Sequence, residues 1–182
     1  MTSIDRQKVA EFFAEGDAAT TSFARGKALE NLIVYLFGLI PGIILTAQNK
    51  MNAFHAQEID VAFWNDGHED GLRWFDFILL VECKNWRDRV GYSELAVFKD
   101  KLSSRGRSMG ILVAANGITG DPIERSRAYS VLERALSDHQ EILVVTRDEI
   151  ESLTDTTELV YLLKQKRAQL AVSGTIFLST GE

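Results

Sequence analysis

The sequence contains one cysteine, two prolines and no long apolar run that is free of interruption. A single thiol, Cys83, excludes an intramolecular disulfide and is typical of a protein in a reducing compartment. The most apolar stretch, LIVYLFGLIPGIILTA, carries Pro41-Gly42 near its middle and is shorter than the roughly 20 apolar residues that a membrane helix needs. We therefore expect a buried helix, a turn and a strand here, and no membrane span.

Positive charge is also in the minority, because 20 Lys and Arg residues stand against 26 Asp and Glu residues and leave a net charge of −6. A surface covered in basic patches is therefore excluded, and any contact with nucleic acid has to be local. The first segment, MTSIDRQKVAEFFAEG, has no basic start followed by an apolar block, so we expect no signal peptide. Together with the lone cysteine, this pattern predicts a cytoplasmic protein.

The spacing of apolar residues predicts a single α/β domain. We expect helices at 4–15, 22–40, 92–105, 122–137 and 158–170, and strands at 43–50, 58–64, 74–83, 109–115 and 141–146. Short turns join the first three strands, which favours an antiparallel meander. Helices separate the last strands, which favours parallel crossovers. The prediction is a mixed five-stranded sheet with helices on its faces.

Charged residues end the central predicted strand in the stretch FDFILLVECKNWRDR. Strand side chains alternate between faces, so Glu82 and Lys84 share one face and Cys83 points to the other. In the preceding strand, AQEIDVAFW, Asp60 is set to lie beside Glu82. Two adjacent carboxylates repel each other, and oxygen ligands of this kind bind a hard cation, Mg²⁺ or Mn²⁺. An exposed ion pair at a strand end is the simpler alternative.

Asp60 followed about twenty residues later by Glu82-Cys83-Lys84 resembles the PD-(D/E)XK nuclease superfamily, with Ile59 in place of its usual proline. The segments ECKNWRDRVGYSELAVFKDKL, GILVAANGITGDPIERS and EILVVTRDEI are similar to Mrr-like restriction endonucleases, with Ile118 replacing an aromatic residue. The resemblance covers about residues 22–150. It implies one restriction-endonuclease-like domain over 1–182, in which 151–182 form a C-terminal helical appendage.

The resemblance implies a metal-dependent DNA endonuclease of prokaryotic restriction or anti-phage defence. Its catalytic residues would be Glu30, Asp60, Glu82 and Lys84, where Glu30 is an acid on the preceding helix that faces the site. Its Mg²⁺ or Mn²⁺ ligands would be Asp60, Glu82 and the backbone carbonyl of Cys83. Glu30 could instead fill a gap in an apolar helical stripe.

One feature of Mrr-like enzymes is missing, because the helix after the catalytic lysine carries no glutamine. Glu94, Lys99 or Lys101 could substitute for it, or the role could be absent. Cations gather after the strand end and favour local binding of DNA phosphates. The expected DNA-binding residues are Arg87, Arg89, Lys99, Lys101, Arg105 and Arg107.

Ordinary surface charge is the alternative for these cations individually, and Trp86 could either stack on a base or cap the core. A second function also stays open, namely a non-enzymatic nucleic-acid-binding or scaffold subunit that retains the nuclease fold. RNA is not excluded as the substrate. A homodimer or a larger defence complex is compatible with the sequence.

Overall fold

A computed structural model describes residues 1–51, 58–121 and 127–174. Its helices are α1 (Arg6–Ala18), α2 (Ser22–Gly38), α3 (Tyr92–Ser104), α4 (Ala128–Ser137), α5 (Arg147–Ser152) and α6 (Thr156–Ser173). Its strands are β1 (Ile43–Met51), β2 (Glu58–Asn65), β3 (Ile78–Lys84), β4 (Met109–Ala114) and β5 (Glu141–Val145). The expected α/β class is confirmed.

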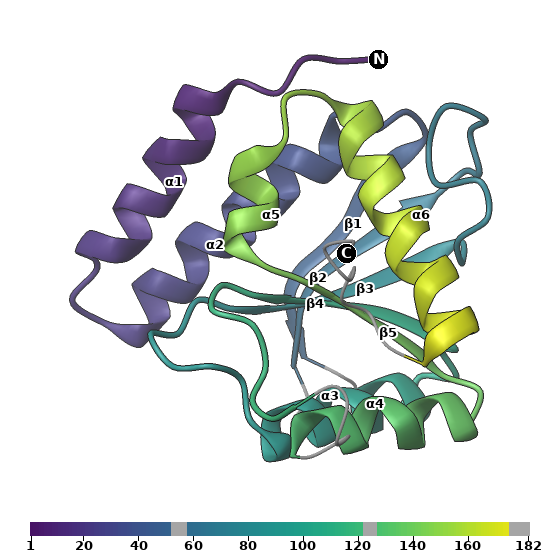
Figure 1. The fold of residues 1–182 in the computed structure, drawn as a ribbon. Coiled ribbons are helices and arrows are strands. Elements are labelled where there is room, and N and C mark those ends of the chain that lie inside the picture. Colours follow the sequence, from purple (N-terminus) through teal and green to yellow (C-terminus); the bar gives the residue numbers. More distant parts are fainter. Residues whose placement is uncertain (52–57, 122–126, 175–182) are drawn as a thin grey trace, which may run out of the picture.

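The five strands form one mixed sheet in the order β1-β2-β3-β4-β5. The pairs β1–β2 and β2–β3 are antiparallel, whereas β3–β4 and β4–β5 are parallel. This is the predicted meander followed by parallel crossovers. Figure 1 shows α3 and α4 on one face of the sheet, and α2, α5 and α6 on the other. Strand β3, in the middle of the sheet, therefore lies between two layers of helices.

Helix α2 forms where its apolar residues recur at helical spacing, and Leu29, Leu32 and Leu36 are buried against the sheet. The hydroxyl of Thr21 caps its start by accepting from the backbone N–H of Ala24. The chain turns into β1 at Gly42, whose φ of 78° lies in the left-handed region that favours glycine. The interrupted apolar stretch therefore becomes a helix, a turn and a strand, as predicted.

Strand β3 begins at Ile78, so the prediction of a strand over 74–83 was wrong at its first residues. The buried side chain of Asn65 donates hydrogen bonds to the carbonyl oxygens of Leu72 and Asp76, at 2.8 and 3.1 Å. These bonds hold the chain in turns before the strand starts. At its other end β3 runs on to Lys84, so all of Glu82, Cys83 and Lys84 belong to the strand.

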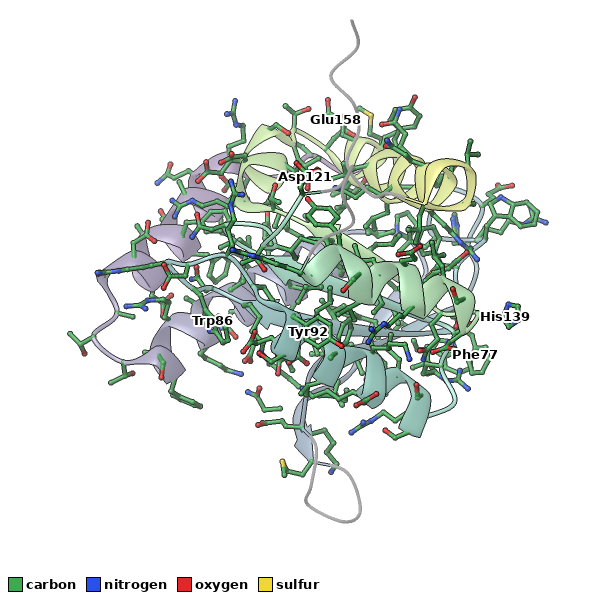
Figure 2. All side chains as sticks on the ribbon, turned by 60° about the horizontal axis from the view of Figure 1, so that its bottom comes forward. Phe77, Trp86, Tyr92, Asp121, His139 and Glu158 are labelled. Carbon is green, nitrogen blue, oxygen red and sulfur yellow. The ribbon has the colours of Figure 1, made fainter. Side chains whose placement is uncertain are left out.

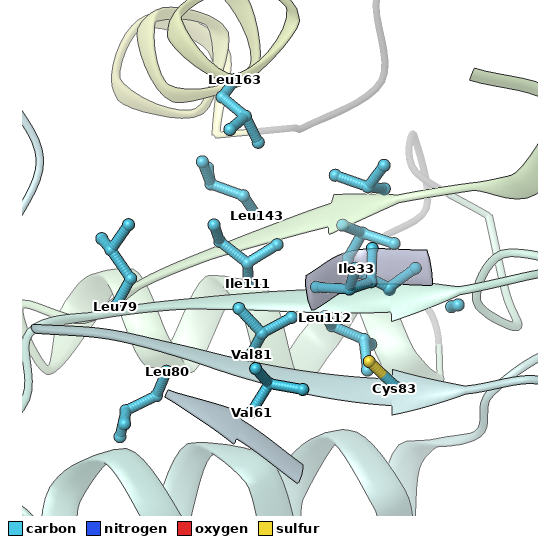
Figure 3. Packing of buried hydrophobic residues seen from close by; sticks show 14 of the residues in the cluster. Ile33, Val61, Leu79, Leu80, Val81, Cys83, Ile111, Leu112, Leu143 and Leu163 are labelled. Atoms are coloured by element: carbon cyan, nitrogen blue, oxygen red, sulfur yellow. The ribbon is translucent and has the colours of Figure 1, made fainter. Parts of the chain in front are cut away.

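Side chains of β3 alternate between the two helical layers. Figure 3 shows Leu80 pointing toward the helices below the sheet, whereas Val81 and Cys83 lie on the other side. Glu82 therefore faces the α3 layer. Gly110 on β4 lets α3 lie close to the sheet, because a Cβ there would be 2.7 Å from the ring of Phe98. This close approach lets Lys101, in the last turn of α3, reach β3.

Three further elements differ from the prediction or extend it. Helix α5 was not expected, although Thr146 and Glu149 form a capping box at its start. Helix α4 begins at Ala128, and residues 122–126 of the expected helix lie outside the described part of the chain. Helix α6, in the region expected as an appendage, contributes Leu159 and Leu163 to the same buried cluster as the sheet. Among the described residues, every helix is too short or too polar to cross a membrane.

Candidate active site

The pairing of β2 with β3 places the predicted acidic residues side by side. Val61 pairs with Val81 in the antiparallel register, and the next residues along the two strands are Asp60 and Glu82. The Oδ2 atom of Asp60 accepts a hydrogen bond of 2.7 Å from the backbone N–H of Cys83. This bond ties the Asp60 carboxylate to the backbone of the neighbouring strand, directly beside Glu82.

Glu82 is 3% exposed and lies between two lysines. Lys84, on the same face of β3, places its Nζ 2.8 Å from Oε1 of Glu82. Lys101, which comes from α3, donates to both carboxylate oxygens of Glu82, at 2.8 and 2.7 Å. The cluster of Asp60, Glu82, Lys84 and Lys101, called here the β3 cluster, therefore joins residues from three elements.

Burial and the neighbouring charge of Glu82 raise the pKa of Asp60 from 3.8 to about 6. The hydrogen bond from Cys83 and the charges of Lys84 and Lys101 act in the opposite direction but do not cancel this effect. The carboxylate of Asp60 is therefore under-compensated in the folded protein. An additional positive charge close to Asp60 would therefore stabilise its carboxylate form.

Lys84 remains an ammonium ion. Burial by itself lowers its pKa, but the charge and the hydrogen bond of Glu82, together with Asp60, outweigh burial, so the pKa is raised. A lysine with a raised pKa is a poor proton acceptor near neutral pH. In this arrangement it can donate a hydrogen bond and offset negative charge, as required of a group that stabilises a phosphoryl transition state.

Glu30 makes its hydrogen bonds with residues outside the β3 cluster. Glu30 lies on α2, and its Oε2 accepts from Lys27 at 3.2 Å and from Gln48 at 3.3 Å. Its negative charge acts instead on Cys83, whose side chain points away from Glu82. The hydrogen bonds of Glu30 therefore lie outside the β3 cluster, and its catalytic role stays a prediction.

Cys83 is buried, and its thiol stays protonated. Burial is the largest cause of its raised pKa, followed by the charges of Asp60, Glu30 and Glu82. A thiolate nucleophile is disfavoured at this position, because every nearby carboxylate opposes a second negative charge. The side chain packs in the core, while the backbone N–H contacts Asp60.

Lys101 lies behind Glu82, and its substitution for the missing glutamine stays a prediction. Of the three alternatives for the missing glutamine, Lys101 is the one whose side chain contacts Glu82. It is 8% exposed, so this position does not support the phosphate contact expected of it. The sequence held a signal for this burial, since residue 101 follows Phe98 by three positions and precedes Leu102, and all three lie on the buried side of α3.

The other expected DNA-binding residues do not form one surface. Arg87 and Arg89 are exposed in the loop after β3. Lys99 pairs with Asp138 at 2.7 Å. Arg105 and Arg107 follow the other end of α3, and the Arg107 guanidinium lies over Phe77, 5.2 Å from the ring centroid. Figure 2 shows Phe77 and Trp86 on opposite sides of the molecule.

Trp86 extends the β3 cluster toward the surface. The Nζ of Lys84 lies 5.8 Å from the centroid of its ring, within the range of a cation–π contact. The indole is 39% exposed. It therefore covers one side of Lys84 while it presents an aromatic face to solvent.

The donor set for a metal is small. Among residues 1–51, 58–121 and 127–174, no group of three or more His, Cys, Asp and Glu side chains is arranged to hold a metal ion. Two carboxylates, from Asp60 and Glu82, remain the side-chain ligands predicted from the sequence. Mg²⁺ is commonly held by one or two carboxylates and completes its shell with water and substrate oxygens, so this small set suits it.

No family model matches the chain, and no curated protein matches it either.

Asp60→Asn should stabilise the protein in EDTA by about 1 kcal/mol near pH 7.5, since it removes the under-compensated charge but keeps an oxygen for the N–H of Cys83. Because folding raises the pKa of Asp60, protonation of Asp60 stabilises the fold fully below about pH 4, and this stability is lost as the pH rises through about 6. The difference in the free energy of unfolding between Asp60→Asn and the wild type should therefore shrink as the pH falls. Thermal melts at several pH values measure it.

Mg²⁺ at matched ionic strength should raise the melting temperature of the wild type more than that of Asp60→Asn. Asp70→Asn, in an exposed turn, is the control and should melt like the wild type. If Asp60→Asn is less stable at every pH and Mg²⁺ shifts both proteins equally, Asp60 is only a structural acceptor for Cys83.

Proposed function

We propose that this protein is a metal-dependent DNA endonuclease with a restriction-endonuclease-like fold. The observation that carries the proposal is the β3 cluster: an under-compensated Asp60, a buried Glu82 and a charged Lys84 meet at the end of β3. Carboxylates beside a lysine at the end of a strand suit hydrolysis of a phosphodiester, because they can hold a metal ion while the lysine offsets negative charge. The sequence resemblance supplies the substrate class and the setting in prokaryotic restriction or anti-phage defence.

Asp60, Glu82 and the backbone carbonyl of Cys83 would hold Mg²⁺ or Mn²⁺. When bound, the ion would supply a Lewis acid and lower the pKa of water. The raised pKa of Asp60 is consistent with this assignment, because extra positive charge would favour its carboxylate form. The bond from the N–H of Cys83 orients the same carboxylate in advance.

The two lysines have separate tasks in the proposal. Lys84 is partly accessible and would donate to the phosphate or to the leaving oxygen as negative charge develops there. Lys101 is buried behind Glu82 and would orient its carboxylate by contacting both oxygens. Lys101 is thus a positioning residue, whereas Lys84 is the one expected to touch substrate.

One observation favours the second function, a non-enzymatic nucleic-acid-binding or scaffold subunit. Glu82 already contacts two ammonium groups, so its charge is balanced without a metal ion. A cluster of this kind can be retained for structure alone. Under this alternative, divalent cations would have no effect on DNA and the β3 cluster would only hold α3 against β3.

The deciding experiment is incubation of supercoiled plasmid, linear duplex and single-stranded DNA, and of RNA, with Mg²⁺, Mn²⁺ or EDTA. The proposal expects cleavage with either cation and none in EDTA. Products from a closed circular plasmid identify an endonuclease, because an exonuclease needs an end. Binding of DNA without cleavage in any cation would favour the subunit function.

DNA affinity should depend on salt through Arg87 and Arg89, because they are exposed beside the β3 cluster. Replacing both with glutamine should flatten the slope of log affinity against log salt concentration by about one to two units. Fluorescence anisotropy over a series of salt concentrations measures the slope. The paired replacement Arg105→Gln and Arg107→Gln, at the far end of α3, should change it less. The reverse ranking would move the DNA path to that end.

A further inference from the structure

A polar hollow of about 650 Å³ opens at the carboxyl ends of the three parallel strands. The side chains that matter in its lining are Arg87, Arg89, Asn116, Tyr129, Thr146 and Asp148. They come from the segments that follow β3, β4 and β5, and from α4. In open α/β sheets, ligands bind in the crevice outside the carboxyl ends of such strands.

The hollow adjoins the β3 cluster. The carbonyl of Lys84 accepts a hydrogen bond of 3.0 Å from the N–H of Ala115, and Ala115 lines the hollow. A second hollow of about 250 Å³ shares Arg87, Ala115 and Asn116 with the first, and Trp86 lines it. Trp86 also contacts Lys84, so this residue connects the lysine with the smaller hollow, which shares lining with the larger one.

The charges in the hollow are mixed. Arg87 and Arg89 face solvent, and no carboxylate in the described ranges forms an ion pair with either of them. Asp148 is exposed at the start of α5 on another part of the lining. Two guanidinium groups suit a phosphate, whereas a nearby carboxylate opposes a simple anion site. The ligand class that fits both is a phosphate joined to a group that donates hydrogen bonds.

A nucleotide has this combination. Its phosphate matches Arg87 and Arg89, and the exocyclic amino group of adenine, cytosine or guanine can donate to Asp148. The ring of half-buried Tyr129 adds an aromatic group to the lining, and the Asn116 amide, whose nitrogen donates to the carbonyl of Trp86 at 2.6 Å, has an oxygen that can accept. The volume lies within the range of small-molecule sites, which is about 300–1,000 Å³.

We propose that the hollow binds one nucleotide of the substrate strand, unstacked from its neighbours, next to the phosphodiester that is cleaved. This inference rests on the proposed function, and it specifies how the substrate is held. Arg87 and Arg89 hold the phosphate, Tyr129 stacks on the base, and Asp148 selects bases with an exocyclic amino group. Thymine lacks that group and is the disfavoured base.

The test measures binding of dAMP, dCMP, dGMP, TMP, deoxyadenosine and inorganic phosphate to the full chain in EDTA by titration calorimetry. We expect dAMP to bind at least tenfold more tightly than deoxyadenosine or inorganic phosphate, and about tenfold more tightly than TMP. Arg87→Gln with Arg89→Gln should weaken dAMP at least tenfold. Asp148→Ala should remove the preference over TMP. Arg73→Gln, an exposed arginine outside the hollow, should leave binding unchanged.

A second measurement links the hollow to the strand. A duplex with 2-aminopurine beside the mapped cleavage position should be brighter when bound to the Lys84→Ala, Tyr129→Ala double variant than to Lys84→Ala alone, because a tyrosine ring that stacks on the base quenches its fluorescence. Equal affinity for dAMP and inorganic phosphate, or equal fluorescence with the two proteins, overturns the inference while metal-dependent cleavage still supports the proposed function. Nucleotide binding without any DNA cleavage overturns both the proposed function and the substrate role of the hollow.

Discussion

Replacing Lys84 by alanine is expected to lower DNA cleavage by about 10²–10³-fold, the loss typical of removing one group that stabilises transition-state charge. The physical reason is its position: its ammonium lies 2.8 Å from Glu82 and remains charged because Glu82 and Asp60 raise its pKa. A group that acts on developing charge lowers kcat more than it weakens ground-state binding. Single-turnover cleavage with Mg²⁺, at saturating protein, measures the effect.

DNA binding by Lys84→Ala in the presence of Ca²⁺ should stay close to the wild-type value, because Arg87 and Arg89 remain exposed. Lys8→Ala is a matched control, since Lys8 is an exposed lysine on α1 that contacts Tyr35. It should cleave at the wild-type rate. Undiminished cleavage by Lys84→Ala, or full activity of the wild type in EDTA, would be incompatible with the proposed function.

Lys101→Met should destabilise the protein by about 3 kcal/mol in EDTA. Methionine fills a similar volume but leaves the buried Glu82 with Lys84 as its remaining cation in the β3 cluster. Breaking a buried pair from one side is costly, because the remaining charge has lost much of its compensation. Denaturant unfolding of both proteins, with comparable slopes against denaturant concentration, measures the difference in the free energy of unfolding.

Two further proteins separate this effect from a general disturbance of α3. Lys99→Met changes a lysine on the same helix that pairs with the exposed Asp138, and its effect should be much smaller. Adding Glu82→Gln to Lys101→Met should recover part of the lost stability, which a double-mutant cycle reports as coupling. Additive losses would mean that Lys101 stabilises the fold by packing and not through Glu82.

Mg²⁺ connects the two lysine predictions. If a cation binds beside Asp60 and Glu82, Mg²⁺ should stabilise Lys101→Met more than the wild type, because it adds charge where charge was removed. Activity at saturating Mg²⁺ should then fall less in Lys101→Met than in Lys84→Ala. The opposite order would assign the larger catalytic role to Lys101.

Local pattern alone was enough to predict how the sheet is built and which residues of it share a face. The period of two in AQEIDVAFW and FDFILLVECK places Asp60 beside Glu82 and Lys84 on the same face as Glu82, once a short connection makes the two strands antiparallel. Neighbouring strands have a fixed spacing, so alternation and register determine these contacts without knowledge of the helices. The same reasoning predicted that Cys83 points away.

Contacts between layers depended on the tertiary structure. Lys101 reaches Glu82 because Gly110 lets α3 lie close to β4, and no pattern within α3 reports that distance. Glu30 meets Gln48 and acts on Cys83, because α2 covers the face opposite to Glu82. Helix rotation and layer spacing are set by the packing of many side chains at once, so a helical residue's partner across layers is decided only when the whole core is assembled.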